Sequence, residues 1–137
     1  MADKIKYWFA VIGSIAIKLL GEWDIWLTSL CTVMILDVIT GLLKAILLRS
    51  EKSSKGGLSS SSMFKGGLKK ICIILMVALG TLLDSIITPN DVFIRIMIVS
   101  YYIANESLSI LENIGACGVP LPKALYRICD SLKNKSE

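Results

Sequence analysis

Four long apolar stretches, separated by short polar segments, constrain the fold of this 137-residue chain more than any other feature. They cover residues 5–20, 25–48, 71–88 and 92–114. The last three contain 24, 18 and 23 residues, close to the roughly 20 apolar residues that a helix needs to cross a bilayer. The first is shorter and carries Lys6 and Lys18. The pattern therefore predicts three or four transmembrane helices.

The composition favours a membrane domain over a soluble helical bundle. Hydrophobic residues make up 54% of the chain and charged residues 19%. A soluble bundle needs helices with a polar face opposite the apolar stripe. Stretches such as IWLTSLCTVMIL and ICIILMVALGTLL are instead apolar most of the way round. We therefore expect one all-α integral membrane domain over residues 1–137.

The residues that most enzymes and metal sites require are scarce. The chain has no histidine, and its four cysteines are scattered without a C-x-x-C pair. The usual general base, the common nucleophile pairs and the usual zinc ligand sets are therefore missing. We therefore expect that the chain is not an enzyme and that it binds no metal and no cofactor. The net charge of +4 does not indicate nucleic-acid binding, because most of the basic residues lie outside the apolar stretches, where they indicate orientation in a membrane.

The positions of the basic residues predict the orientation in the membrane. Residues 49–70 hold six of the 15 Lys and Arg residues, whereas the turns at 21–24 and 89–91 hold none. Basic loops remain in the cytoplasm, so the loop 49–70 and the tail 115–137 are predicted to be cytoplasmic. A stripe of apolar residues in the tail predicts a short amphipathic helix on the inner leaflet or against the bundle. The first segment is expected to span, although it could lie flat or be a cleaved signal peptide.

Two pairs of opposite charges are predicted inside the membrane segments, where each unpaired charge is costly. Asp84 and Arg95 both lie within about one turn of the outer ends of their segments. An ion pair that closes the hairpin is the simplest interpretation. Lys44 and Glu112 share a level nearer the cytoplasm, which makes them a second candidate pair.

Two acids remain at mid-depth without an obvious cation. Asp37 and Glu106 lie near the middles of their segments, so at least one is expected to be protonated when buried. Other polar residues follow each acid at helical spacing, so each acid lies in a polar stripe along its helix. Such a stripe either joins helices or lines a water-filled path. The candidate oligomer-contact or pore-lining residues are Asp37, Thr40, Gly41, Lys44, Tyr102, Glu106, Ser109, Glu112 and Asn113.

Several of these residues lie in short sequence motifs that occur in a known family. The motifs are DVITGLLKA at 37–45, KGGLKK at 65–70, YYIANESLSILEN at 101–113 and GVPLP at 118–122. The single acid Asp84 lies between the second and the third of them. In this order and spacing the chain resembles the phage holins, the toxin-secretion and phage-lysis holin family that includes clostridial toxin-release proteins.

The resemblance implies a lysis protein without catalysis. Members of the family accumulate as multi-pass proteins in the bacterial cytoplasmic membrane and assemble into homo-oligomers. At a set moment they permeabilise that membrane, so that an endolysin or a large protein toxin leaves the cell. The implied partners are therefore the lipid bilayer, further copies of the chain, and the released endolysin or toxin.

Two other classes remain open at the level of the sequence. Four short helices, an embedded glutamate and a basic cytoplasmic face also describe small proton-coupled multidrug transporters. Those proteins carry their essential glutamate in the first span, and the first span here has none. An antiholin or a membrane scaffold is the third class.

Overall fold

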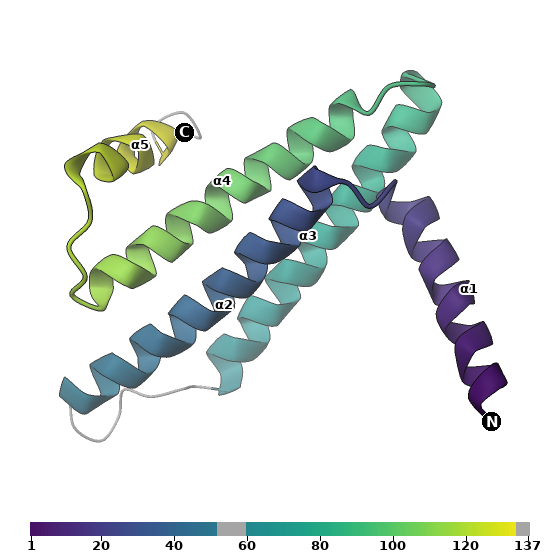
Figure 1. The fold of residues 1–137 in the computed structure, drawn as a ribbon. Helices are drawn as coiled ribbons and strands as arrows, with labels where there is room; N and C mark the ends of the chain where they lie inside the picture. The colour runs from purple at the N-terminus through teal and green to yellow at the C-terminus, as the bar shows by residue number, and fades with distance from the viewer. Residues whose placement is uncertain (52–59, 134–137) are drawn as a thin grey trace.

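The computed structural model describes residues 1–51 and 60–133, and this part of the chain folds entirely into helices joined by turns (Figure 1). The helices are α1 (Ala2–Leu20), α2 (Ile25–Glu51), α3 (Ser60–Ile87), α4 (Phe93–Ala116) and α5 (Lys123–Lys133). The predicted all-α class is confirmed for these residues. Helices α1, α2 and α4 cover the apolar stretches 5–20, 25–48 and 92–114.

Helix α3 begins well before its apolar stretch. Residues 60–70 were expected in the basic loop, but they form the first three turns of α3. No proline interrupts this segment, and lysine is a good helix former, so the helix extends from the apolar region through Lys65, Lys69 and Lys70. Most of the Ser- and Gly-rich centre of the loop, residues 52–59, lies outside the described residues.

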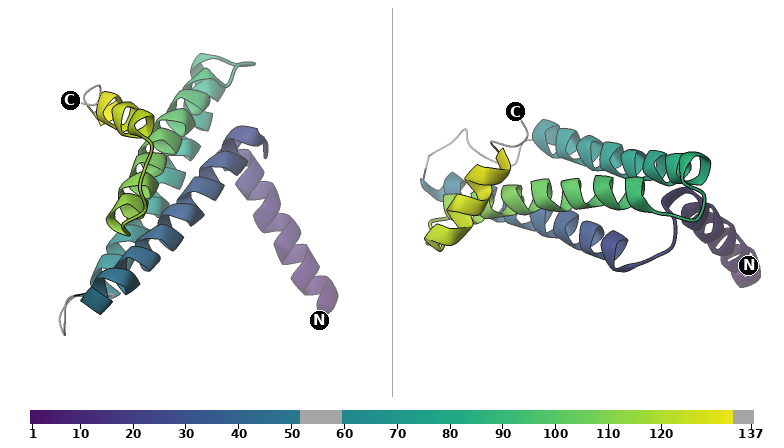
Figure 2. Two further views of the ribbon diagram at one scale, coloured as in Figure 1. Left: turned by 60° about the vertical axis from the view of Figure 1, so that its left-hand side comes forward. Right: turned by 90° about the horizontal axis from the view of Figure 1, so that it is seen from above.

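Helices α2, α3 and α4 form the bundle, with α4 packed against both of the others (Figures 1 and 2). Their shared core consists of Leu27, Leu30, Met34, Ile73, Val77 and Val99. Leu30, Val77 and Val99 are completely buried. These side chains close the centre of the bundle over the half that contains the two short turns.

Two helices are long and apolar enough to cross a membrane, namely Ile25–Leu48 and Ser60–Ile87. In their most apolar 18-residue windows only 11% and 22% of residues are buried. The core helix of a soluble protein would be mostly buried, so these helices expose the surface expected in contact with lipid.

Helix α1 extends away from the bundle. None of its residues is buried, and the views in Figures 1 and 2 show it diverging from α2 after the turn that joins them. Only its last residue, Leu20, packs against the bundle core. The aromatic residues Tyr7, Trp8 and Phe9 are all exposed.

Helix α5 follows the Pro120 and Pro122 linker and lies apart from the three-helix bundle (Figure 1). A short helix is therefore present in the predicted tail. The apolar stripe predicted for it includes Cys129 and Leu132, whose side chains lie outside the described set. Its amphipathic character and its contact with a membrane remain predictions.

Candidate functional site

A buried arginine joins the two turns at one end of the bundle. Arg95, near the start of α4, is 2% exposed. Its Nε donates to the carbonyl of Leu20 at 2.6 Å and its Nη2 to the carbonyl of Glu22 at 3.0 Å. Its Nη1 and Nη2 lie 2.7 and 3.3 Å from the two carboxylate oxygens of Asp24. Such a two-point arginine–carboxylate contact fixes geometry as well as charge, so Arg95 holds the α1–α2 turn against α4.

The turn itself fits closely around this guanidinium. Gly21 has a φ of 80°, a conformation that favours glycine. A Cβ at this position would lie 3.0 Å from Nε of Arg95. The hydrogen bond from Arg95 also holds the pKa of Asp24 below its ordinary value of 3.8. Asp24 is therefore an ionised partner throughout the neutral range.

Asp84 caps the next helix instead of forming an ion pair with a side chain. Its Oδ1 accepts the backbone N–H of Ile94 at 2.9 Å, and its Oδ2 accepts that of Arg95 at 2.8 Å. The hydroxyl of Thr88 donates to Oδ1 at 3.1 Å. Backbone N–H groups in the first turn of a helix have no partner within the helix, and their positive end attracts an anion. Asp84 from α3 thus satisfies the start of α4.

The predicted ion pair between Asp84 and Arg95 needs correction. The two residues do meet, but through the backbone N–H of Arg95. The guanidinium makes its ion pair with Asp24 instead. The hairpin between α3 and α4 is therefore closed by the hydrogen bonds from the start of α4 to Asp84. The charge of Arg95 instead pairs with Asp24 in the turn before α2. The sequence signal for Asp24 was its place in a turn that holds no basic residue.

A second charged cluster lies deeper, at the junction of all three bundle helices. The amine of Lys70 on α3 lies 2.9 Å from Oδ2 of Asp37 on α2 and also contacts Oε2 of Glu106 on α4. The side chains are 17%, 18% and 8% exposed, in the order Lys70, Asp37, Glu106. One cation thus bridges two carboxylates, and we call these three residues the Lys70 triad.

The triad corrects the expectation that Asp37 and Glu106 have no cation. Lys70 was missed because it was assigned to the basic loop, although it directly precedes the apolar stretch at 71–88. The stem of a lysine carries its amine several ångströms along the helix. A cation at the edge of a membrane segment can therefore serve acids that lie further in.

Four other predicted residues extend the triad toward the far end of the bundle. Nδ2 of Asn113 lies 3.4 Å from both Oδ1 of Asp37 and Oγ1 of Thr40, and Nζ of Lys44 is 3.5 Å from Oδ1 of Asn113. These donor–acceptor distances are long for hydrogen bonds, so the contacts are weak and mainly orient the side chains. Gly41 lies beside this amide, and a Cβ there would meet Nδ2 of Asn113 at 3.7 Å, an ordinary van der Waals distance.

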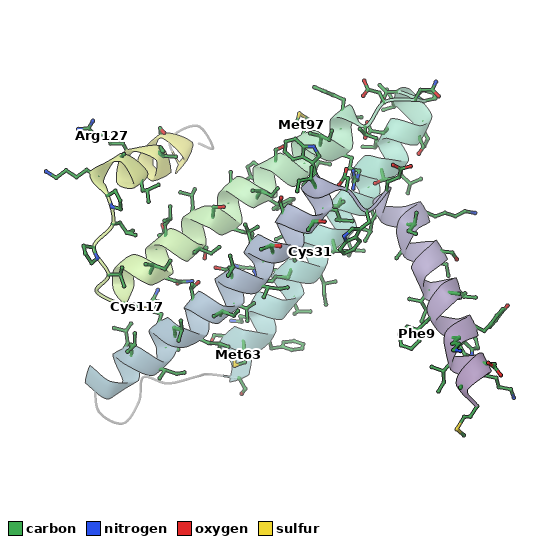
Figure 3. The ribbon with its side chains drawn as sticks, viewed as in Figure 1. Phe9, Cys31, Met63, Met97, Cys117 and Arg127 are labelled. Atoms are coloured by element: carbon green, nitrogen blue, oxygen red, sulfur yellow. The ribbon has the colours of Figure 1, made fainter. Side chains whose placement is uncertain are left out.

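The cluster borders a pocket of about 410 Å³ between α2, α3 and α4. Its lining includes Ser109 together with two glycines of α3, Gly66 and Gly67; Met63, labelled in Figure 3, lies at the same end of α3. The remaining lining residues are Val38, Gly41, Leu42 and Ala45 of α2, Ser62 of α3, and Asp37, Lys70 and Asn113 of the cluster. Water or a polar group from another molecule can therefore reach the triad from this side.

One predicted residue, Tyr102, lies outside this network. Tyr102 packs against the apolar core, and its ring lies 5.2 Å from that of Tyr101 in an edge-on arrangement. Glu112 is exposed on α4, and its pairing with Lys44 remains a prediction. Among the described residues no group of three or more potential ligands is placed to hold a metal ion.

The fold and these clusters define a class of protein: a helical membrane protein whose apolar helices are held together by buried charges. More particularly, the chain belongs to the bacteriophage holin family, whose sequence profile matches residues 14–134. The resemblance to phage holins that was inferred from the sequence motifs is thereby confirmed. Membership in this family indicates a membrane location and a role other than catalysis.

Individual relatives cover most of the chain. A protein described as a probable holin, from Bacillus phage phi105, is 33% identical over 100 residues, which are 73% of this chain and 68% of that protein. An uncharacterized 14.9 kDa protein in the nagH 3′ region of Clostridium perfringens is 34% identical over 131 residues, 96% of this chain and 94% of that protein. The uncharacterized protein YqxH of Bacillus subtilis is 31% identical over 112 residues, 82% and 74% of the two chains. No solved structure matches the chain.

Proposed function

We propose that this protein is a holin that gathers as homo-oligomers in the bacterial cytoplasmic membrane and permeabilises it. An endolysin, or in some systems a large protein toxin, would then leave the cytoplasm. The holin profile over residues 14–134 and the relative described as a probable holin support this role.

The observation that carries the oligomeric part of the proposal is the closed centre of the bundle. Leu30, Val77 and Val99 meet there with no exposed surface, and the pocket beside the triad is about 410 Å³. A folded hydrolase is far larger than this pocket. A single copy therefore offers no path for it, and release requires several copies that together line or border an opening.

The arrangement of turns supports the proposed multi-pass topology. Arg95 joins the α1–α2 turn to the start of α4, so the two turns without basic residues share one end of the bundle. Helix α2, which precedes the basic connector in the sequence, ends at the other end of the bundle, and helix α3, which follows it, begins there (Figure 1). The positive-inside rule then assigns the connector and the C-terminus to the cytoplasm. With α1 as a span the protein crosses four times, and without it three times.

The Lys70 triad is the proposed site of the change from inactive to open oligomers. Within one copy its charges compensate one another across three helices. Breaking such a pair exposes a charge that must find another partner or water. We expect the triad, Thr40, Lys44, Ser109 and Asn113 to face other copies or the lumen once the helices separate.

The experiment is expression of the chain with and without an endolysin in a bacterial host. With both proteins we expect a delay, then an abrupt fall in culture turbidity and release of a folded cytoplasmic reporter. The chain alone should permeabilise the membrane without dissolving the wall. Membrane insertion without release would contradict the holin proposal and favour an antiholin or a scaffold.

The transporter alternative makes a different prediction. A proton-coupled exporter needs a carboxylate that is free to exchange protons, whereas Glu106 here contacts Lys70. Export of a lipophilic cation that stops in Glu106→Gln would favour that alternative. Leakage of folded protein from vesicles that contain only this chain would exclude it.

A further inference from the structure

An amide side chain faces outward from the middle of α4. Asn105 is exposed, whereas its neighbour Glu106 is buried and contacts Lys70. Within the part of the chain that the structure describes, the amide of Asn105 makes no hydrogen bond. It is not one of the polar residues that the sequence stripes singled out, although it follows Tyr102 by three residues and precedes Ser109 by four and therefore borders their stripe on its exposed side.

The depth of Asn105 makes this exposure costly. Helix α4 packs between α2 and α3, the two helices suited to cross a membrane. Asn105 follows Phe93 by twelve residues, or about 18 Å along the helix. The hydrocarbon layer is about 30 Å thick, so the amide lies near its centre. No water is available there, and an amide in hydrocarbon without a hydrogen bond is strongly disfavoured.

We infer that Asn105 of one copy hydrogen-bonds to Asn105 of a second copy, so that the outward face of α4 is a contact between copies. Copies of one chain insert in the same orientation, so identical residues lie at identical depth. An amide carries both a donor and an acceptor, which makes the pair self-complementary. This inference rests on the proposed function, since it requires membrane insertion and association of copies.

The residues around Asn105 suit a contact between two parallel helices. Tyr101 lies one turn away on the same face and is 56% exposed, so its hydroxyl can join the hydrogen bonds. Met97, labelled in Figure 3, continues the stripe and is 55% exposed. Ala104, three residues after Tyr101 and so its neighbour on the helix surface, is small enough to let two backbones approach closely.

The geometry implies a dimer as the unit of assembly. A contact of Asn105 with Asn105 relates the two copies by a two-fold axis along the membrane normal. Such a contact uses the same surface on both copies and closes with two of them. Larger oligomers must therefore use a second surface.

Disulfide crosslinking in membranes tests the contact. The chain carries Asn105→Cys after its four native cysteines are replaced by alanine, and an oxidant is added to isolated membranes. The control is Leu75→Cys on α3, which is 62% exposed. Because Asp84 meets the N–H groups of Ile94 and Arg95, Leu75 lies close to the level of Asn105 on the antiparallel helix. We expect rapid dimer formation at position 105 and little at position 75.

A second measurement tests the hydrogen bond itself. Asn105→Leu should weaken dimerisation in detergent about three- to tenfold, the range expected for a polar contact between membrane helices. Asn105→Gln keeps an amide and should retain most of the affinity. Because the side chain is exposed, neither substitution disturbs the packing of the bundle.

The outcomes separate this inference from the proposed function. Equal crosslinking at positions 75 and 105, or unchanged dimerisation in Asn105→Leu, overturns the inference even if the wild-type chain lyses cells. Crosslinking at position 105 in a chain that releases no protein would instead support the contact and refute the holin role.

Discussion

At the scale of single residues, the stability of the bundle depends on Lys70 more than on any other lysine that the structure describes. Lys70→Met leaves Asp37 and Glu106 facing each other without a cation. Removal of one partner from a buried charge cluster costs about 3 kcal/mol or more. We expect a lower midpoint of thermal unfolding in detergent and an altered onset of lysis.

The matched control is Lys69→Met, since Lys69 is the neighbouring residue and is exposed. It should change the midpoint little. Neutralising the whole triad with Asp37→Asn, Glu106→Gln and Lys70→Met together should recover much of the loss, because no uncompensated charge remains. A single Lys70→Met variant as stable as Lys69→Met would contradict the importance of the triad.

Asp24 gives the contact with Arg95 a predictable pH dependence. Its pKa is lowered from 3.8 because Arg95 donates hydrogen bonds to the carboxylate. The unfolded chain therefore takes up a proton at a higher pH than the folded one. The contribution of Asp24 is fully present above the ordinary carboxyl pKa and is lost as the pH falls through the lowered value.

We therefore expect Asp24→Asn to unfold at a lower temperature than the wild type at pH 5 to 7. The difference should shrink as the pH falls below about 4. Comparing the two chains removes the effect of other carboxyl groups that titrate in both. Asp3→Asn, at an exposed position in α1, is the control. A difference that stays constant down to pH 2.5 would show that the charge of Asp24 contributes nothing.

At the scale of helices, α3 and α4 pack closely against each other at Gly80. A Cβ there would lie 2.8 Å from Cδ1 of Ile98 and 3.1 Å from Cα of Arg95. Gly80→Ala should therefore destabilise the bundle by about 1–3 kcal/mol through overpacking. Gly67→Ala on the same helix meets open space and should stabilise it by up to about 1 kcal/mol through helix propensity. Thermal unfolding of both variants measures the contrast, and equal effects would argue against close packing at Gly80.

The helices themselves could largely be predicted from the sequence, because their causes are local. Apolar runs and the turns at 21–24 and 89–91 place the ends of α1, α2 and α4 within a few residues. The start of α3 could not be predicted in this way. Its glycines and lysines are also typical of a loop, and only the continuous helix reveals that Lys70 lies within it.

The partners of the charged residues were harder to predict, because they depend on distances between helices. Counting residues inward from the ends of the segments correctly predicted that Asp84 lies close to Arg95. It could not predict that Asp84 contacts the backbone N–H of Arg95 and not its guanidinium. It also could not show that the Arg95 side chain turns toward Asp24. Depth along a helix can be read from a sequence, whereas the direction in which a side chain points around the bundle requires the packed structure.

At the scale of the whole molecule, the position of α1 decides whether the proposed topology has three spans or four. Most of its apolar side chains are exposed, and of the apolar residues only Val11, Ala16 and Leu20 are partly covered. Such a surface is stable only in lipid or against other molecules. Arg95 holds the end of α1 at the same end of the bundle as the α3–α4 turn. A spanning α1 therefore returns the N-terminus to the side of the basic connector.

Cysteine labelling of intact cells tests this topology in a chain whose native cysteines are replaced by alanine. Glu22→Cys, in the α1–α2 turn, should react with a membrane-impermeant reagent from outside. Ser61→Cys, at the start of α3, should react only after the cells are opened, because its end of the bundle adjoins the basic loop. Ala2→Cys distinguishes the two remaining arrangements. Protection in intact cells means four spans, whereas labelling from outside means that α1 does not cross. Labelling of Ser61→Cys from outside would invert the proposed orientation.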